Sequence, residues 1–244
     1  MPKRTLPRVL RRAAVLWLLP LASLAAPSAP LDPFDAKYTV RAKGFKVAEM
    51  TLSLQRDGEA RFLYRARTRA AGLLALFRDD RVDEQSLWIY YEGSIRPLRY
   101  RYDHTGRDEP RHVRLRFHWE RGVVENTVSG DSWRMDIPPG TLDKLAIQLA
   151  VMLDLRRGER ALTYPIADGG KLKTYRFEIV GRERVETPAG EYQTVKLRRQ
   201  REDDDERVTH FWCAPTLGFL PVQVEHMKKG KGTAHMTLES VRGL

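Results

Sequence analysis

The chain has 244 residues, of which 42% are hydrophobic and 31% are charged, and this composition supports one sizeable core but not clearly two. Its formal charge at pH 7 is +11, which points to a negatively charged partner. The single cysteine, Cys213, excludes a disulfide within the chain, and its neighbours Trp212 and Ala214 indicate a buried thiol.

The first 25 residues have the pattern of a secretory signal peptide. An apolar stretch, Ala13 to Leu19, is followed by Ser23-Leu24-Ala25, whose small residues suit cleavage before Ala26. The stretch is too short to span a bilayer and no later one is long enough, so we expect a periplasmic protein with no transmembrane segment in its mature chain. The basic residues that precede it are Lys3, Arg4, Arg8, Arg11 and Arg12.

Loss of these five basic residues on cleavage would leave a formal charge of +6. The polyanions of a cell envelope are lipid headgroups, lipopolysaccharide phosphates and acidic glycans, so we expect one of these as a partner and do not expect nucleic acid. The chain contains neither a P-loop nor a GxGxxG motif, and we expect no cofactor.

Residues 26–35 are rich in proline and alanine and predict a flexible leader, while residues 36–244 predict a single β-rich domain. Lys43-Gly44 and Asp57-Gly58 are typical of hairpin turns. The apolar run Gly72 to Phe77 breaks the alternation and predicts a loop or edge segment packed on the core. Period-two alternation predicts strands over residues 36–43, 45–55, 59–70, 79–91, 95–104, 111–119, 123–128 and 132–137.

The segment Thr141 to Gly158 has clear helical spacing. We expect Thr141 as its N-cap, Asp143 in its first turn and Gly158 as its C-terminal cap. Its apolar residues cover more than one side, so the helix should be enclosed by the rest of the fold. The apolar residues that fall among polar ones are Ile147, Val151 and Leu155.

Strand alternation returns after the helix, over residues 162–166, 172–185, 192–199, 208–213, 219–225 and 233–241. One long succession of strands interrupted by one helix predicts a mainly β fold. We expect a large curved antiparallel meander sheet or incomplete barrel, with one central α-helix packed in its concavity.

Several short segments together resemble a family of exported bacterial proteins known as domain of unknown function 3108. The resemblance extends from about residue 36 to the C-terminus and implies a periplasmic, mainly β protein without established catalytic residues. The segments that carry it are Gly72 to Asp79, Arg96-Pro97 with Tyr100, Leu142-Asp143, Thr187 to Tyr192 with Val195, Phe211-Trp212, and Leu220-Pro221-Val222.

Arginines alternate with apolar residues along neighbouring predicted strands and would lie on the face opposite the core. Guanidinium groups in such an array suit recognition of phosphate or carboxylate groups. The alternative is a solvated outer face whose arginines pair with acidic residues such as Asp83 and Glu125. The candidate anion-binding residues are Arg65, Arg67, Arg99, Arg101, Arg114 and Arg116.

Aromatic residues lie on the predicted core side of the same strands, where they could bind acyl chains or sugars or could simply form the core. The candidates for apolar or stacking contacts are Tyr64, Trp88, Tyr100, Tyr102 and Trp119.

Motifs for enzymatic chemistry are missing from the sequence. His112 and His118 point to one face but are some 20 Å apart on an extended strand, and no HxH, HExxH or CxxC spacing occurs, so we expect no metal site. There is no G-x-S-x-G elbow for a serine nucleophile. We name no catalytic residue.

Three functional hypotheses remain open from the sequence. The first is a non-enzymatic periplasmic protein that binds an amphiphilic or anionic envelope component, such as a lipid, lipopolysaccharide or glycan. The second is a scaffold or accessory subunit of an envelope assembly with a protein partner. The third is an envelope hydrolase, which would need a histidine and a carboxylate or serine to converge in a pocket.

Overall fold

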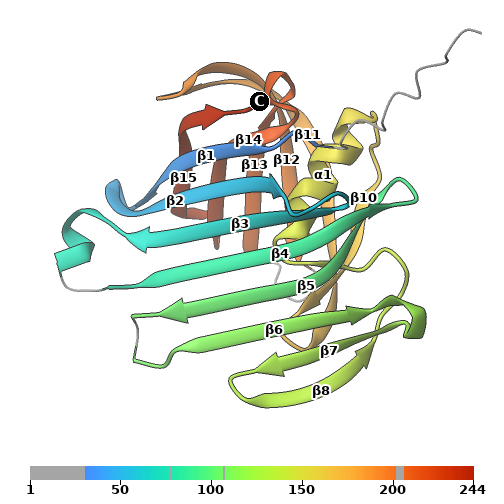
Figure 1. Cartoon of the computed structure of the whole chain (residues 1–244). Helices are drawn as coiled ribbons and strands as arrows, with labels where there is room; N and C mark the ends of the chain where they lie inside the picture. The colour runs from blue at the N-terminus through green and yellow to red at the C-terminus, as the bar shows by residue number, and fades with distance from the viewer. Residues whose placement is uncertain (1–30, 77–78, 107, 202–205) are drawn as a thin grey trace, which may run out of the picture.

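A single curved sheet of 15 strands dominates the computed structural model, which describes residues 31–76, 79–106, 108–201 and 206–244. The signal peptide predicted for residues 1–25 lies outside the described residues. The strand order is β8-β7-β6-β5-β4-β3-β2-β1-β15-β14-β13-β12-β11-β10-β9. The chain is therefore a meander in two halves, joined where the first strand pairs with the last (Figure 1).

The first half contains eight antiparallel strands connected mainly by tight turns. Its strands are β1 (Phe34–Ala42), β2 (Phe45–Arg56), β3 (Arg61–Ala70), β4 (Arg81–Tyr91), β5 (Ser94–Thr105), β6 (Arg111–His118), β7 (Val123–Val128) and β8 (Asp131–Asp136). Two 3-10 helices, η1 (Gly72–Leu76) and η2 (Trp119–Arg121), lie between them.

The second half begins with the short strand β9 (Leu142–Asp143) and the helix α1 (Ala146–Arg156). A third 3-10 helix is η3 (Pro215–Leu217). The other strands are β10 (Leu162–Asp168), β11 (Lys171–Thr187), β12 (Gly190–Arg201), β13 (Arg207–Ala214), β14 (Leu220–Lys228) and β15 (Lys231–Arg242).

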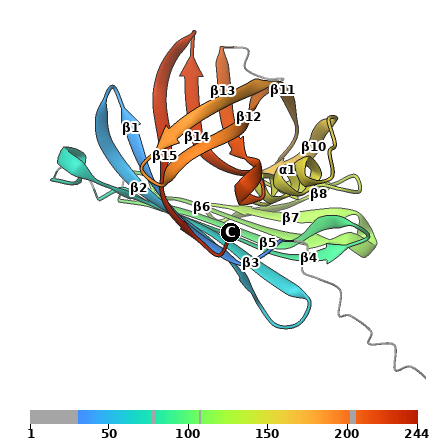
Figure 2. The ribbon, with the colours of Figure 1, turned by 90° about the horizontal axis from the view of Figure 1, so that it is seen from above.

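Alternation along each strand separates an inner face from an outer one. In β3, Phe62, Tyr64 and Ala66 are at most 3% exposed, whereas Arg67 is exposed. Figure 2 shows β3 to β8 as one layer, with α1 and strands β11 to β15 on the same side of it. The core thus fills the space enclosed by the concave face of the sheet, where α1 also packs, and the expected fold class is confirmed.

The edge strand β8 approaches the turn between β10 and β11 through a side chain. The turn between β10 and β11 contains Gly169 and Gly170, and a Cβ atom on Gly170 would lie 1.8 Å from Cζ2 of Trp133 in β8. Glycine at this position therefore allows the indole ring to pack directly on the turn. This contact narrows the opening between the two ends of the sheet.

The start of the helix differs from the expectation. Thr141 does not cap α1, because its hydroxyl donates a hydrogen bond to the carbonyl of Pro138 at 2.7 Å. Leu142 and Asp143 instead form β9, which runs parallel to β10, and the helix begins only at Ala146. The expected C-terminal cap is confirmed, since Gly158 has a φ of +80° and donates to the carbonyl of Leu155.

The expectation that the helix is enclosed is also confirmed. Ile147, Val151 and Leu155, which fall among polar residues in the sequence, are 5% to 6% exposed. Contact with the sheet on one side and with the second half of the chain on the other explains this wide burial.

The leader predicted for residues 26–35 ends earlier than expected. Strand β1 already begins at Phe34, and Leu31 is only 2% exposed. Because both side chains are large and apolar, burying them favours order in this part of the chain despite the proline between them.

We expect substitution of Leu149 by serine to destabilise the fold strongly. Leu149 is fully buried in the middle of α1, so the change removes apolar contacts and buries a hydroxyl, at a cost of about 3 kcal/mol or more. Urea unfolding followed by circular dichroism measures this. Gln148→Ala, at a partly exposed position on the same helix, is the control and should change stability by less than about 0.5 kcal/mol. A wild-type midpoint for Leu149→Ser would show that the helix does not lie in the core.

Candidate functional site

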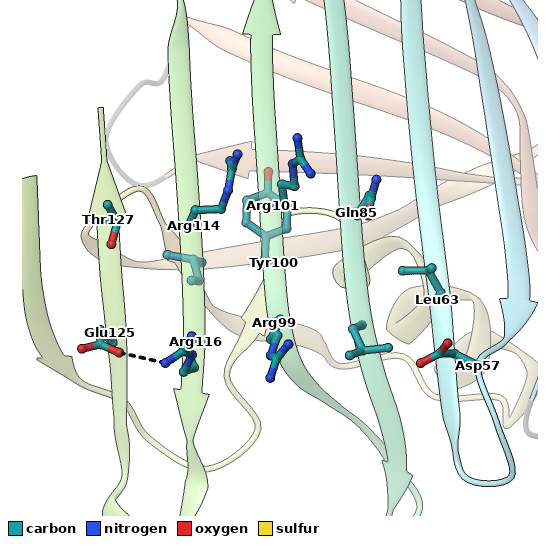
Figure 3. A pocket seen from close by; sticks show the side chains of 12 residues that line it. Asp57, Leu63, Gln85, Arg99, Tyr100, Arg101, Arg114, Arg116, Glu125 and Thr127 are labelled. Carbon is teal, nitrogen blue, oxygen red and sulfur yellow. Dashed lines mark ion pairs between the residues drawn. The ribbon is translucent and has the colours of Figure 1, made fainter. Parts of the chain in front are cut away.

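Four arginines from two adjacent strands converge on the outer face of the sheet. Arg99 of β5 lies directly opposite Arg116 of β6, and Arg101 lies opposite Arg114. Figure 3 shows the four guanidinium groups on the same side of the strands, away from α1. They line a hollow of about 480 Å³, which we call the arginine hollow. Like charges directly opposite each other destabilise a sheet, so stability does not account for this arrangement.

Two carboxylates neutralise part of the positive charge. Asp103 binds Arg101 and accepts hydrogen bonds from Arg114 at 2.7 Å and from His112 at 2.6 Å. Burial acts to raise the pKa of Asp103, but the bonds from His112, Arg101 and Arg114 outweigh it and lower the pKa to about 2. Asp103 is therefore ionised at neutral pH.

The other carboxylate is Glu125, which lies 3.9 Å from Arg116. Among the described residues, Arg99 has neither an ion pair nor a hydrogen-bond partner. Its charge is thus available to a ligand. With Asp57 also in the lining, the four arginines of the hollow are opposed by three acidic residues, Asp57, Asp103 and Glu125.

The other two predicted arginines, Arg65 and Arg67, lie on the same outer face but line a separate hollow of about 310 Å³. Arg67 pairs with Asp83 at 3.3 Å. This pair agrees with the alternative of a solvated outer face whose arginines pair with acidic residues. Gln85 of β4 lies between Arg65 and Arg101 in the strand register and separates the two groups. The structure thus brings together four of the six candidates.

The predicted aromatic residues belong to the inner face. Tyr64 and Trp88 are fully buried, and Tyr100 is 3% exposed, so their rings form part of the core. Tyr102 and Trp119 are only partly buried, and the indole of Trp119 stacks on Phe117 with the ring centroids 5.5 Å apart. A ligand would reach only these last two without displacing core side chains.

A buried polar cluster, which the sequence did not reveal, lies where α1 begins. The Asp143 carboxylate accepts a hydrogen bond from the hydroxyl of Ser86 in β4 at 2.6 Å. Its other oxygen accepts from the backbone N–H groups of Leu145 and Ala146 at 2.9 and 2.8 Å. Asp143 therefore caps the helix and connects it to the sheet.

Glu84, two residues before Ser86 on the same inner face, extends this cluster. Its carboxylate accepts a hydrogen bond from the hydroxyl of Tyr100 at 2.8 Å. The presence of two polar residues, Glu84 and Ser86, at inward positions beside Trp88 was the available sequence signal. Close by, Lys144 and Lys173 lie 3.8 and 2.9 Å from Asp168.

Burial changes the ionisation of both acidic residues in the cluster. Desolvation raises the pKa of Asp143 to about 6, although hydrogen bonds from Ser86, Ala146 and Leu145 oppose the shift. Desolvation also raises the pKa of Glu84, against the effect of Lys144. Nearby, the hydroxyl of Tyr64 and Nε1 of Trp88 have no hydrogen-bond partner among the described residues. Burying a polar atom without a partner costs free energy, so these two atoms also destabilise this region.

The architecture defines a class of protein, namely a mainly β protein with one long curved sheet around a single helix. The chain belongs to the family described as "Protein of unknown function (DUF3108)", whose model matches residues 37–239, and the resemblance expected from the sequence is confirmed. No curated protein matches the chain.

Three solved structures of distant sequence are similar to this chain to differing degrees. A β-barrel-like protein of domain of unknown function DUF1849 from Brucella abortus is 11% identical, with a TM-score of 0.55 over 88% of this chain and 98% of that one. A candidate lipoprotein from Parabacteroides distasonis is 11% identical, with a TM-score of 0.34 over 87% and 96% of the two chains. A candidate exported protein with a YmcC-like fold from Bacteroides fragilis is 13% identical, with a TM-score of 0.31 over 86% and 94%.

The first of these similarities supports the fold alone. In the part of the chain that the structure describes, no helix has the length and hydropathy needed to cross a membrane. Within the same residues, no three histidine, cysteine, aspartate or glutamate side chains lie together as metal ligands would. Cys213 is 1% exposed, as its sequence neighbours indicated, and burial raises the pKa of its thiol to about 12.

We expect Asp143→Asn to weaken the dependence of stability on pH. Because the folded pKa of about 6 exceeds the ordinary value of 3.8, the folded state binds more protons than the unfolded state between these values. Wild-type stability should therefore fall as pH rises from about 4 to 6, by up to about 3 kcal/mol from this group. The asparagine can still accept the two backbone hydrogen bonds, so the helix cap remains.

Urea unfolding at pH 4.5 and pH 7.5 tests this expectation. Asp103→Asn is the control, since its pKa of about 2 places its own titration below this range. An undiminished difference between the two pH values in Asp143→Asn would contradict the assignment. Some pH dependence should remain, because the pKa of Glu84 is also raised.

Proposed function

We propose that this chain is a non-enzymatic periplasmic protein that binds an anionic envelope component through the arginine hollow. Arg99, which has no ion-pair or hydrogen-bond partner among the described residues and lies opposite Arg116 on the adjacent strand, is the observation that carries the proposal. Arg101 and Arg114 add two further guanidinium groups, held by Asp103. Planar guanidinium groups bind phosphate and carboxylate oxygens in a bidentate manner, so a phosphorylated glycolipid or an acidic glycan fits this lining.

The floor of the hollow also favours an amphiphilic partner. Leu63 and Leu87, partly exposed on β3 and β4, lie opposite each other on the outer face and line the hollow beside the arginines. An apolar contact next to a phosphate-binding group would suit a lipid headgroup and the beginning of its chains. The predicted export signal and the basic mature chain support a location among such molecules.

Removing two charges from the hollow should weaken binding to anionic envelope lipids. We expect Arg99→Gln with Arg116→Gln to reduce affinity for lipopolysaccharide and for phosphatidylglycerol vesicles by roughly tenfold to a hundredfold, because charge-assisted hydrogen bonds are lost. The salt dependence of binding should also decrease. Sedimentation with vesicles and calorimetric titration with lipopolysaccharide measure the two effects.

The control removes two arginines outside the hollow, by Arg41→Gln with Arg184→Gln. It lowers the net charge by the same amount, so an equal loss of affinity in both variants would indicate attraction to a charged surface without a specific site. Failure of the wild-type protein to bind either probe would refute the proposal.

A second candidate function is that of an accessory subunit in an envelope assembly, and two exposed apolar residues favour it. Phe45 and Leu76 are 69% and 75% exposed, and they lie in β2 and η1, which contact each other at one end of the sheet. If this end binds a protein, Phe45→Ser with Leu76→Ser should abolish a crosslinked product that the wild type forms in cells. Unchanged crosslinking in the double variant would argue against this surface.

A further inference from the structure

A second large hollow lies at the C-terminal end of α1. Its volume is about 850 Å³, and its lining comes from the end of the helix, the connection from α1 to β10, strands β11 and β12, and Phe219. The strand pairing explains why space remains here. Strand β10 pairs with β11 only as far as the partners Leu162 and Phe177, so within the described residues no strand pairs with this edge of β11 beyond that point, while β12 continues to pair with its other edge. We call this space the β11 hollow.

The wall of the β11 hollow exposes apolar side chains. Ile179 and Val180 are 38% and 40% exposed, although both are large and apolar. The register between β11 and β12 shifts between Ile179 and Gly181, which leaves Val180 as the extra residue of a β-bulge. Bulges redirect side chains, and this one leaves two adjacent apolar residues facing the hollow instead of one.

Phe219 lines the same hollow in a strained conformation. Its φ is +65° and that of Gly218 is +59°, so two successive residues adopt the left-handed region after η3. A residue with a Cβ atom is disfavoured there, and a bulky one especially so. The N–H of Phe219 donates to the carbonyl of Ala214 at 2.8 Å, which holds the turn in place. Strained residues often occur where a side chain has a binding role, since a glycine would form this turn without strain.

The side chains that line the β11 hollow have a net positive charge. Four arginines and two glutamates line it, and Glu178 is already paired with Arg198 at 2.5 Å. Among the described residues, neither Arg160 nor Arg182 has an ion pair or a hydrogen-bond partner. The hollow therefore combines apolar walls with two available cationic groups, which complements a molecule with an apolar chain and an acidic end.

We propose that the β11 hollow binds a single-chain anionic amphiphile, a fatty acid or a lysophospholipid. The chain contacts Ile179, Val180 and Phe219, while Arg160 and Arg182 bind the carboxylate or phosphate. A volume of about 850 Å³ lies in the range of pockets for ligands of this size. This site shares no residue with the arginine hollow, so either site can exist without the other.

Calorimetric titration of the purified protein with oleate and with lysophosphatidylglycerol, each below its micellar concentration, tests the proposal. We expect saturable binding of one molecule to one chain. Tighter binding of oleate would identify a carboxylate as the preferred acidic group, and tighter binding of lysophosphatidylglycerol would identify a phosphate. Lysophosphatidylcholine, whose headgroup has no net charge, should bind at least about tenfold more weakly. Equal binding of lysophosphatidylcholine, or no saturable binding of either anionic probe, would overturn the proposal.

Two matched variants locate the site. Ile179→Ser should weaken binding about tenfold through lost apolar contact, while Leu172→Ser, on the same strand with 43% exposure but outside the hollow, should leave binding unchanged. Arg160→Gln with Arg182→Gln should weaken binding of the anionic probes, while Arg99→Gln with Arg116→Gln should not. Equal losses in variant and control would overturn the assignment.

Photocrosslinking supplies a readout that does not depend on any variant. A fatty acid with a diazirine in its chain should label the wild-type peptide that contains Ile179 and Val180, and unlabelled oleate should compete with it. Labelling confined to the peptides of β5 and β6 would place the amphiphile in the arginine hollow and refute the β11 site. Competition by an extended acidic peptide, but not by oleate, would mean that the hollow accepts a peptide strand.

Discussion

The hydrogen bonds of Asp143 are the interaction on which the arrangement of the two halves depends. One carboxylate oxygen accepts from Ser86 of the first half, and the other accepts from the N–H groups that begin α1. Asp143 also belongs to β9, which pairs with β10 of the second half. A single fully buried side chain thus connects the sheet, the helix and the last edge strand. Loss of these contacts would leave a buried charge or unpaired N–H groups, both of which are costly.

This connection determines which face of the sheet can bind a ligand. Because α1 is held against the concave face, Tyr64, Trp88 and Tyr100 are buried on the inner face of the sheet and the arginines alternating with Tyr100 in β5 lie on the outer one. The outer face then carries Arg99 and Arg116 opposite each other, and of these two only Arg116 lies near a carboxylate, that of Glu125. The second place left uncovered is the edge of β11, where β10 stops pairing. Both proposed binding surfaces therefore lie outside the core.

The strands could be predicted from the sequence because their pattern is local. Alternation such as Arg99-Tyr100-Arg101-Tyr102 identifies both the strand and its two faces without knowledge of its neighbours. The conformation of Leu142-Asp143 could not be predicted in this way, since its pairing with Ile166 and Ala167 depends on residues more than 20 positions later. The same limit applies to the β11 hollow, which results from where β10 stops and from a bulge at Val180. The six candidate arginines could be identified from the sequence. Their division into two hollows could not, because it depends on β4 lying between β3 and β5, where Gln85 separates Arg65 from Arg101.

Footprinting of arginine side chains with phenylglyoxal, with and without lipopolysaccharide, tests whether the arginine hollow binds an anionic envelope component. Modification is read by mass spectrometry on the wild-type protein, so no variant needs to fold. We expect lipopolysaccharide to protect Arg99, Arg101, Arg114 and Arg116, while Arg41 and Arg184 are modified equally in both samples. Protection spread evenly over the exposed arginines, or protection that spares the arginine hollow, would contradict it.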